Sequence, residues 1–253
     1  MRTENPLNRS PEPIRLNKFL AQCRLASRRK AEDLIRSGHV AIDGIPIRSA
    51  NQEVALGSVV TVDGNVVEPE RDRLIVAFHK PCGVVTTTDD PQGRKTVLDL
   101  LPEKFRGQGL FPVGRLDKET SGLLLLCNDG DLMHRLLHPS HEVWKRYQVV
   151  VHGKVSGAVV ARLRSGVFVD GKKTAPAEIH TLKHADSSET VLEIRIREGR
   201  KRQIRRMCRE VKLQVIHLKR VAFGPIELGN MQEGECRALS MNEIQQLERA
   251  GSL

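Results

Sequence analysis

The chain has 253 residues, of which 39% are hydrophobic and 28% are charged. This balance is typical of a globular protein and excludes both a disordered chain and a small disulfide-stabilised scaffold. Lys and Arg number 41 against 31 acidic residues, for a formal net charge of +10, and this excess favours polyanions, nucleic acids above all, as partners. No apolar run is long enough to span a membrane, and the N-terminus lacks the apolar stretch of a signal peptide.

The numbers and positions of cysteines, histidines and aromatic residues exclude further classes of protein. Five cysteines are scattered along the chain without a CxxC pair, so we expect reduced thiols in a cytoplasmic protein rather than disulfides or a zinc site. His134, His138 and His141 are close in sequence, but no further ligand at metal spacing accompanies them. Aromatic residues make up only 3%, which argues against a broad base-stacking surface for single strands.

Composition and turn residues divide the chain into two domains. Residues 1–13 contain three prolines and no periodicity, and we expect a disordered lead-in. Residues 14–68 predict a small α+β module. The charged, proline-containing segment 69–73 predicts a linker, and residues 74–253 predict a larger second domain.

The small module is predicted to begin with two helices. Leu16, Phe19 and Leu20 have helical spacing, and Ser27 is placed to cap a second helix that Gly38 ends. Short alternating strands follow, and two tight hairpin turns are predicted at Asp43-Gly44 and Asp63-Gly64.

The second domain is predicted to be richer in strands than in helices. Strands are expected at 74–78, 110–113, 123–127, 147–151, 191–197 and 215–221. Helices are expected at 132–137, 159–163 and 202–211. A last helix is expected after Ser240, which can form a capping box with Glu243. The predicted fold class is therefore α+β, with a mixed and mainly antiparallel sheet in this domain.

The positive charge is concentrated in two segments. Residues 14–48 hold eight basic against three acidic residues, and residues 194–220 hold eleven against two. In the first segment, Arg28, Arg29 and Lys30 occupy the first turn of the predicted helix, where cations oppose the helix dipole. This placement becomes favourable if the end of the helix faces RNA phosphates.

The predicted helix at 202–211 combines an apolar stripe with a basic face. The stripe recurs at helical spacing through Ile204, Met207, Cys208 and Val211. The remaining surface carries four arginines with almost no nearby acid: Arg202, Arg205, Arg206 and Arg209. A merely solvated basic helix is the alternative, but such helices usually mix charges of both signs, so we favour phosphate binding.

Three short motifs contain candidate catalytic residues, although each motif alone is only weak evidence for a catalytic role. Asp117 lies in a glycine-bounded loop between two apolar strands, where an aspartate most often caps a turn. Tyr147, the only tyrosine, opens a predicted strand, where packing is its most common role. A basic stretch after Glu198 joins a strand to the basic helix and places Arg205 about one turn inside it.

Taken together and in order, the motifs closely resemble those of the RsuA-type ribosomal RNA pseudouridine synthases. The matching segments are Lys80-Pro-Cys-Gly83, Gly114-Arg-Leu-Asp117, Lys145-Arg-Tyr147 and Glu198-Gly-Arg…Gln203-Ile-Arg205. The stretch from Arg15 to Gly44 resembles the S4 RNA-binding domain that precedes the catalytic domain in this family. The resemblance covers residues 14–250, and the ordered set is far more specific than any single motif.

The resemblance implies a role for each matched residue. Asp117 corresponds to the essential aspartate, which acts either as nucleophile at the ribose C1′ or as stabiliser of a glycal-forming route. Tyr147 corresponds to the tyrosine that packs against the target base, and Arg205 to the basic residue that pairs with the aspartate. The family's reaction needs no cofactor and no metal. RNA contacts are expected from Arg115, Arg15, Lys18, Arg28, Arg29, Lys30, Arg200, Arg202 and Arg206.

Two departures from the family patterns concern the turn in the S4 domain, where Arg24 could change the turn or add an RNA contact, and the choice of substrate. Arg24 stands where the S4 pattern commonly has glycine. Arg205 is an arginine where the small-subunit branch tends to have lysine, and segment 89–102 resembles the large-subunit branch. A uridine of 23S rRNA is therefore favoured over one of 16S rRNA.

The resemblance leads us to expect a cytoplasmic, monomeric enzyme without membrane or metal partners. Two alternatives are a non-catalytic ribosome-assembly factor with an inactive synthase fold and a general RNA chaperone that acts through charge alone. The intact Asp117, Tyr147 and Arg205 argue against the first alternative, because an inactive copy would be free to lose them.

Overall fold

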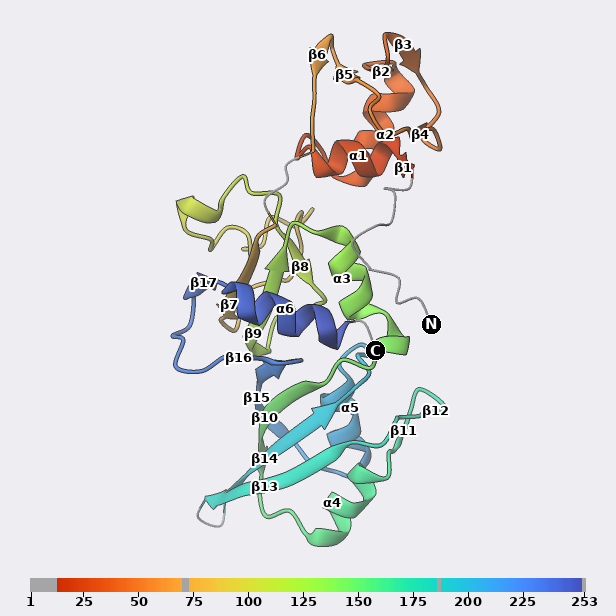
Figure 1. The fold of residues 1–253 in the computed structure, drawn as a ribbon. Helices are drawn as coiled ribbons and strands as arrows, with labels where there is room; N and C mark the ends of the chain where they lie inside the picture. Colours follow the sequence, from red (N-terminus) through yellow and green to blue (C-terminus); the bar gives the residue numbers. More distant parts are fainter. Residues whose placement is uncertain (1–12, 70–72, 186–187, 252–253) are drawn as a thin grey trace, which may run out of the picture. The chain divides into compact units, whose positions relative to one another are not determined.

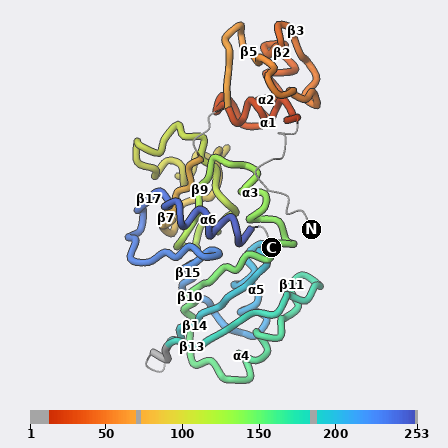
Figure 2. The backbone as a smooth tube through the Cα atoms, in the orientation of Figure 1, coloured from red at the N-terminus to blue at the C-terminus, as the bar shows by residue number. Residues whose placement is uncertain are grey.

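The computed structural model describes residues 13–69, 73–185 and 188–251. The predicted lead-in at 1–13 lies outside the described residues except for its last position, and so do residues 70–72 of the predicted linker at 69–73. The chain divides into two compact units, Met1–Asp72 and Arg73–Leu253. Figure 1 labels their helices and strands, and Figure 2 follows the backbone of each as a tube.

The first unit packs two helices against short strands. Its elements are β1 (Ile14–Arg15), α1 (Leu16–Gln22), α2 (Arg28–Ser37), β2 (Val40–Ile42), β3 (Ile45–Ile47), β4 (Glu53–Val54), β5 (Val60–Val62) and β6 (Asn65–Val66). An antiparallel sheet runs in the order β3-β2-β5-β6, and β1 pairs with β4. Leu16 and Leu20 of α1 are fully buried against Ala31 and Ile35 of α2, so the apolar spacing decides which face of each helix turns inward.

The predicted caps and turns of this unit are confirmed. The Ser27 side chain accepts the Lys30 N–H at 3.3 Å, and Gly38 ends α2 with a φ of 85°. Both residues of each Asp-Gly pair have positive φ, which is the type I′ geometry that suits twisted hairpins. Arg24 also has a positive φ, 58°. The turn that commonly uses glycine therefore keeps its left-handed shape here with an arginine.

The second unit is built on one large sheet. Its strands are β7 (Ile75–Lys80), β8 (Phe111–Val113), β9 (Ser121–Cys127), β10 (Lys145–His152), β13 (Glu178–Ala185), β14 (Glu189–Ile196), β15 (Val215–Phe223), β16 (Ile226–Glu227) and β17 (Cys236–Ala238). Within the described residues the order is β13-β14-β10-β15-β9-β7-β17, with β16 beside β15 and β8 beside β9. The β15–β9 pairing is parallel and joins two antiparallel halves. A separate hairpin contains β11 (Phe168–Val169) and β12 (Lys172–Lys173).

Four helices cover this sheet in two pairs. They are α3 (Gly130–Leu137), α4 (Gly157–Arg164), α5 (Gln203–Glu210) and α6 (Met241–Ala250), and short 3₁₀ turns lie at η2 (Glu103–Phe105) and η3 (Pro139–His141). Figure 1 shows α4 and α5 with the β13-β14-β10 half, and α3 and α6 with the β9-β7 half. The predicted capping box of Ser240 and Glu243 is formed at the start of α6. No helix of the described residues is long and apolar enough to cross a membrane.

The core places β9 at the centre of this unit. Leu123 and Leu125 pack in the cluster that includes α3 and α6, whereas Leu124 and Leu126 pack in a cluster with Leu116 on the other face. The strand is therefore buried on both sides, as a central strand should be. The predicted α+β class with a mixed, mainly antiparallel sheet is confirmed. The loop that carries Asp117 leads directly into this buried strand.

Candidate active site

One row of residues crosses the centre of the large sheet. Lys80 of β7 lies opposite Gly122 of β9. Gly122 lies opposite Arg220 of β15, which in turn lies opposite Tyr147 of β10. Residues directly opposite one another on neighbouring strands face the same side of a sheet. Two cations and the tyrosine therefore share one face, next to the Asp117 loop.

Gly122 allows this row to form. Its φ is 109°, and a Cβ at this position would lie 2.2 Å from the carbonyl oxygen of Arg220. A side chain here would force β15 away from β9, because the clash is with backbone rather than with a flexible side chain. Both the close approach and the backbone conformation require glycine.

The segment 114–120, termed the Asp117 loop, is held through its backbone. Each carbonyl oxygen from residue 116 to residue 120 accepts a hydrogen bond. The donors, in order, are Thr86 Oγ1 at 2.8 Å, the Thr120 N–H at 3.0 Å, the Gly83 N–H at 2.8 Å, Arg205 Nη2 at 2.8 Å and Lys80 Nζ at 2.9 Å. These five hydrogen bonds restrain the backbone of the loop, on which Asp117 is partly buried.

Lys80 is a fully buried cation within electrostatic reach of Asp117. Its side chain is 0% exposed, and its Nζ also donates to the Pro81 carbonyl at 2.9 Å. Burial lowers the pKa of Lys80 to about 8, and nearby negative charge, including that of Glu119 and Asp117, partly offsets this effect. When protonated, Lys80 favours the ionised form of a carboxyl group beside it.

Tyr147 and Arg220 complete the row on the other side of Gly122. The half-buried Tyr147 packs against both neighbouring core clusters, one of which contains Leu116 of the Asp117 loop. Arg220 is 3% exposed and donates from Nε to the Leu123 carbonyl at 2.7 Å, while its buried Nη2 has no hydrogen-bond partner. The arrangement places an aromatic ring and positive charge next to the loop that carries Asp117.

Arg205 reaches the Asp117 loop through the backbone rather than through the carboxylate. Its Nη2 donates to the carbonyl oxygen of Glu119, two residues beyond Asp117. No ion pair joins Arg205 to Asp117 in the part of the chain that the structure describes, so the direct pairing implied by the resemblance is not formed. Arg205 instead supports the loop and adds positive charge near it, and its buried Nε lacks a partner.

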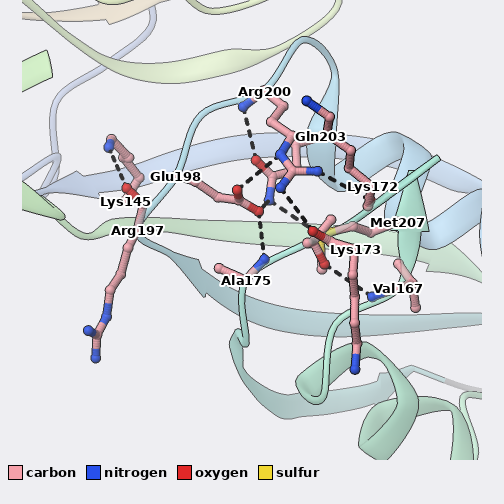
Figure 3. Close-up of polar contacts among 11 residues, drawn as sticks. Lys145, Val167, Lys172, Lys173, Ala175, Arg197, Glu198, Arg200, Gln203 and Met207 are labelled. Atoms are coloured by element: carbon pink, nitrogen blue, oxygen red, sulfur yellow. Dashed lines mark hydrogen bonds and ion pairs between the residues drawn. The ribbon is translucent and has the colours of Figure 1, made fainter. Parts of the chain in front are cut away.

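Glu198 organises the start of α5 (Figure 3). Its carboxylate accepts from Gln203 Nε2 at 2.6 Å, from the Ala175 N–H at 3.0 Å and from Arg200 Nε at 3.0 Å. Arg200 also donates to two backbone carbonyls of β12, at 3.2 and 2.9 Å. The motif that begins at Glu198 therefore ties the start of α5 to the β11–β12 hairpin, and Arg200 belongs to this scaffold.

The expectation that the four arginines of the α5 region lack acidic partners is wrong for two of them. Arg202 pairs with Glu119 at 2.8 Å, and Arg206 pairs with Asp170. Both acids come from other parts of the chain, so a local sequence pattern could not reveal them. RNA contacts by Arg200, Arg202 and Arg206 stay predictions, and each contact would have to share or exchange an existing partner.

The remaining predicted RNA-binding residues lie mainly at the surface. Arg115 is exposed on the Asp117 loop. The first unit exposes Arg15, Arg28, Arg29 and Lys30, and Lys18 is partly buried. Among the described residues, no ion pair neutralises the three cations in the first turn of α2.

Lys80, which was matched only as part of the Lys80-Pro-Cys-Gly83 motif, and Arg220 were not among the predicted site residues. Lys80 had a usable signal, because it ends an apolar strand immediately before a proline. Arg220 had one as well: it lies two residues after the buried Leu218 and therefore shares its inward face. Within the residues described, no group of three His, Cys, Asp or Glu side chains could hold a metal ion.

The chain is similar to known proteins over nearly its whole length. The family model for RNA pseudouridylate synthase matches residues 74–210, and the model for the S4 domain matches residues 14–60. An uncharacterized RNA pseudouridine synthase of Aquifex aeolicus is 40% identical over 95% of this chain and 96% of its own. Ribosomal large subunit pseudouridine synthase B of Bacillus subtilis is 37% identical over 92% of this chain and 95% of its own. A crystal structure of a pseudouridylate synthase covers 92% of this chain and 99% of its own, with a TM-score of 0.66 and 29% identity.

Proposed function

Since this chain belongs to the RNA pseudouridylate synthase family, and is therefore an enzyme that isomerises uridine in RNA, we propose that its substrate is a uridine of ribosomal RNA. The large-subunit name of the Bacillus subtilis relative supports 23S rRNA over 16S rRNA. The S4 match supports RNA binding by the first unit. The corresponding location is the bacterial cytoplasm, where ribosomal RNA is made and assembled.

The proposed reaction conserves every atom of the nucleotide. The bond between uracil N1 and ribose C1′ breaks, the detached uracil rotates, and a bond forms between C5 and C1′. The proton on C5 is lost and N1 gains one, so no oxidant, reductant or second substrate is consumed. Asp117 acts either as nucleophile at C1′ or as the group that stabilises a glycal-forming route.

The electrostatics around the Asp117 loop support this role. An ionised aspartate can attack or stabilise an electron-poor C1′ only if burial does not protonate it. Lys80 and Arg205 place positive charge around the loop, and both hold it by hydrogen bonds to backbone carbonyls. A loop backbone restrained in this way has less to reorganise during the reaction, which is the principal advantage of a preorganised site.

Tyr147 is proposed to receive the target base. A uridine inside a helix must be extruded before C1′ becomes accessible, at a cost of a few kcal/mol. Stacking on one aromatic ring returns about 1–3 kcal/mol of that cost. The position of Tyr147, in the same row as Arg220 and beside the Asp117 loop, suits one extruded base rather than a run of stacked bases.

One observation supports the proposal most directly. The Asp117 loop, whose carbonyl groups are hydrogen-bonded, lies next to the row of residues that includes Tyr147. The test is Asp117→Asn, which keeps the shape and removes the charge. We expect a loss of pseudouridine formation on the order of 10⁴-fold, measured by mass spectrometry of a 23S rRNA transcript, with RNA affinity retained. Asp89→Asn, an exposed aspartate in the same unit, is the matched control and should be fully active.

A normal rate with Asp117→Asn would contradict the assigned role of Asp117. Absence of pseudouridine with the unaltered protein, together with tight RNA binding, would instead favour the non-catalytic assembly factor. Mapping pseudouridines in ribosomal RNA from cells with and without the gene would identify the target nucleotide. That map would also decide between 23S and 16S rRNA.

A further inference from the structure

An open, shallow basic cavity of about 400 Å³ lies along α5 beside the proposed active site. Its lining consists of Arg202, Arg205, Arg209, Lys212, Leu213, Gln214 and Val215. We infer that this cavity, termed the α5 cavity, binds one nucleotide of the RNA strand that flanks the modified uridine. It would hold the phosphate with its cations and the base with its apolar wall. The inference rests on the proposed function and goes beyond it by assigning a second nucleotide subsite.

The charge of the lining points to an anionic ligand. Four of the seven lining residues are cations and none is an acid. Arg202 already pairs with Glu119, but Arg209 and Lys212 form no ion pair within the described residues. The Nε of Arg205 is buried without a hydrogen-bond partner. Arg and Lys side chains that lie close together and have few acidic partners within the protein are suited to bind phosphate oxygens.

The shape and the apolar wall point to a nucleotide rather than to a phosphate alone. A volume of about 400 Å³ falls in the range of sites for small organic ligands and exceeds what a bare phosphate would fill. Leu213 and Val215 contribute apolar surface to it, and both pack against the core beneath α5. A flat base can bury its face on such a surface while its phosphate meets the cations.

Two of the lining residues have left-handed backbone conformations, one at each end of α5. Arg202, before the helix, and Lys212, after it, have left-handed φ values of 53° and 60°. At the second position the Lys212 N–H bonds to Arg209 and the Leu213 N–H bonds to Cys208, the Schellman motif in which glycine is usual. A charged residue in place of glycine carries a conformational cost. Both of these residues line the cavity.

The cavity is connected to the active site through two of its own residues. Arg202 and Arg205 both bind Glu119, the first through its carboxylate and the second through its carbonyl oxygen. Glu119 lies two residues after Asp117. A nucleotide in the cavity would therefore lie along α5 next to the extruded uridine, and it would fix the direction of the strand across the site.

The test uses the full-length protein and a fluorescein-labelled ten-nucleotide oligouridine, with affinity measured by anisotropy over a range of NaCl concentrations. Arg209→Ala combined with Lys212→Ala removes two cations that have no assigned catalytic role. We expect the slope of log affinity against log salt to become shallower by about 0.7 for each phosphate that the variant no longer binds. The matched control is Lys154→Ala combined with Arg162→Ala, which removes two exposed cations elsewhere on the same unit.

A second variant, Gln214→Glu, changes almost no volume and adds a negative charge to the cavity. Repulsion of one nearby phosphate predicts an affinity loss of about fivefold, whereas Gln245→Glu on α6 should have no effect. With 4-thiouridine in the oligomer, irradiation and trypsin digestion should yield a cross-link on the peptide 213–219. Gln214→Glu should remove most of that cross-link.

The outcomes separate the inference from the proposed function. Unchanged salt slopes in the Arg209/Lys212 variant, or unchanged affinity in Gln214→Glu, would overturn the nucleotide subsite even if the enzyme forms pseudouridine normally. Failure of the unaltered protein to form pseudouridine on ribosomal RNA would overturn the proposed function. A shifted salt slope and a cross-link at 213–219 would still support the cavity as a nucleotide subsite in that case.

Discussion

The first turn of α2 differs from the α5 region in how its positive charge is neutralised. In α2, Arg28, Arg29 and Lys30 are exposed in the first turn, and no ion pair in the described residues neutralises them. In the α5 region, Arg202 and Arg206 are bound to acids from distant parts of the chain. A count of arginines in the sequence therefore does not separate structural cations from ligand-binding ones. The acidic residues that the tertiary fold brings next to each arginine do make that separation.

Among the changes that test this comparison, the largest expected effect belongs to Arg205, which binds the backbone of the Asp117 loop. Arg205→Ala removes a preorganised donor from the Glu119 carbonyl together with a charge near Asp117. We expect a loss of about a hundredfold in single-turnover rate at saturating enzyme, and a smaller loss of RNA affinity, because Arg205 also lines the α5 cavity. Arg205→Lys should recover part of the rate because it retains the charge. A loss of affinity without a loss of rate would make Arg205 a phosphate ligand instead.

Glu198 tests whether the Arg200 contacts are structural. Glu198→Ala leaves the Gln203 amide and the Ala175 N–H without their acceptor, and we expect unfolding of the second unit to become easier by about 2–3 kcal/mol. Urea denaturation followed by circular dichroism measures the change. Glu210→Ala, an exposed acid on α5, is the control and should lie within about 0.5 kcal/mol of the unaltered protein. Equal stability of the two variants would remove Arg200 from the scaffold.

Removal of the unpaired cations in the first turn of α2 should weaken RNA binding and leave the reaction rate unchanged. Arg28→Gln combined with Arg29→Gln is expected to weaken binding of a 23S rRNA transcript by about tenfold at low salt and to flatten the salt dependence. Single-turnover rate at saturating enzyme should not change. Arg36→Gln, which removes a cation already paired with Glu32 at the other end of the same helix, should have a smaller effect. Identical salt slopes for the two variants would contradict an RNA role for the first turn.

The buried Lys80 leads us to expect that the reaction rate falls as the pH rises. Because burial lowers the pKa of Lys80 to about 8, the positive charge near Asp117 disappears as pH rises, and the rate should fall by about fourfold at pH 8.5. Lys80→Met should be slow at every pH and lack this step. Lys145→Met should retain it, although burial also lowers the pKa of Lys145 to about 8. A flat profile from pH 7 to 9 in the unaltered enzyme would exclude this role.

The lowered pKa of Lys80 also affects the free energy of unfolding. This contribution rises with pH, whereas the reaction rate is expected to fall. Below pH 8 both the folded and the unfolded chain carry a protonated Lys80, and the folded chain bears the cost of burying it. Between pH 8 and the ordinary lysine pKa, the unfolded chain binds more protons, so the contribution of Lys80 to the free energy of unfolding rises with pH. A rate that falls while this contribution rises separates loss of catalysis from loss of folding.

The smallest expected effect concerns the left-handed Arg24 in the first unit. Arg24→Gly relieves the strain of a positive φ, and this gain is partly offset by the greater freedom of glycine in the unfolded chain. We expect stabilisation of the first unit by about 0.5 kcal/mol, measured by thermal unfolding. Arg24→Ala, which keeps a side chain at the same φ, should give no such gain. Destabilisation by glycine would show that contacts of the arginine side chain outweigh the strain.

Local signals in the sequence predicted most of the elements. Ser27, Gly38 and the Ser240–Glu243 pair form the expected caps, and the predicted central strands are present. The missed strand β13 (Glu178–Ala185) mixes polar and apolar residues without a strong pattern. Its pairing with β14 gives it a strand conformation, and such a partner cannot be identified from a local window.

The sequence by itself determined the turns, the caps, the apolar faces and, through its ordered motifs, the family. Each of these depends on residues a few positions apart or on a direct match of residues. Only the tertiary structure decided which charges are neutralised, where Arg205 binds, and that Lys80, Gly122, Arg220 and Tyr147 form one row. The physical reason is that hydrogen bonds, ion pairs and strand register join residues far apart in the chain, and their partners become defined only when the sheet assembles.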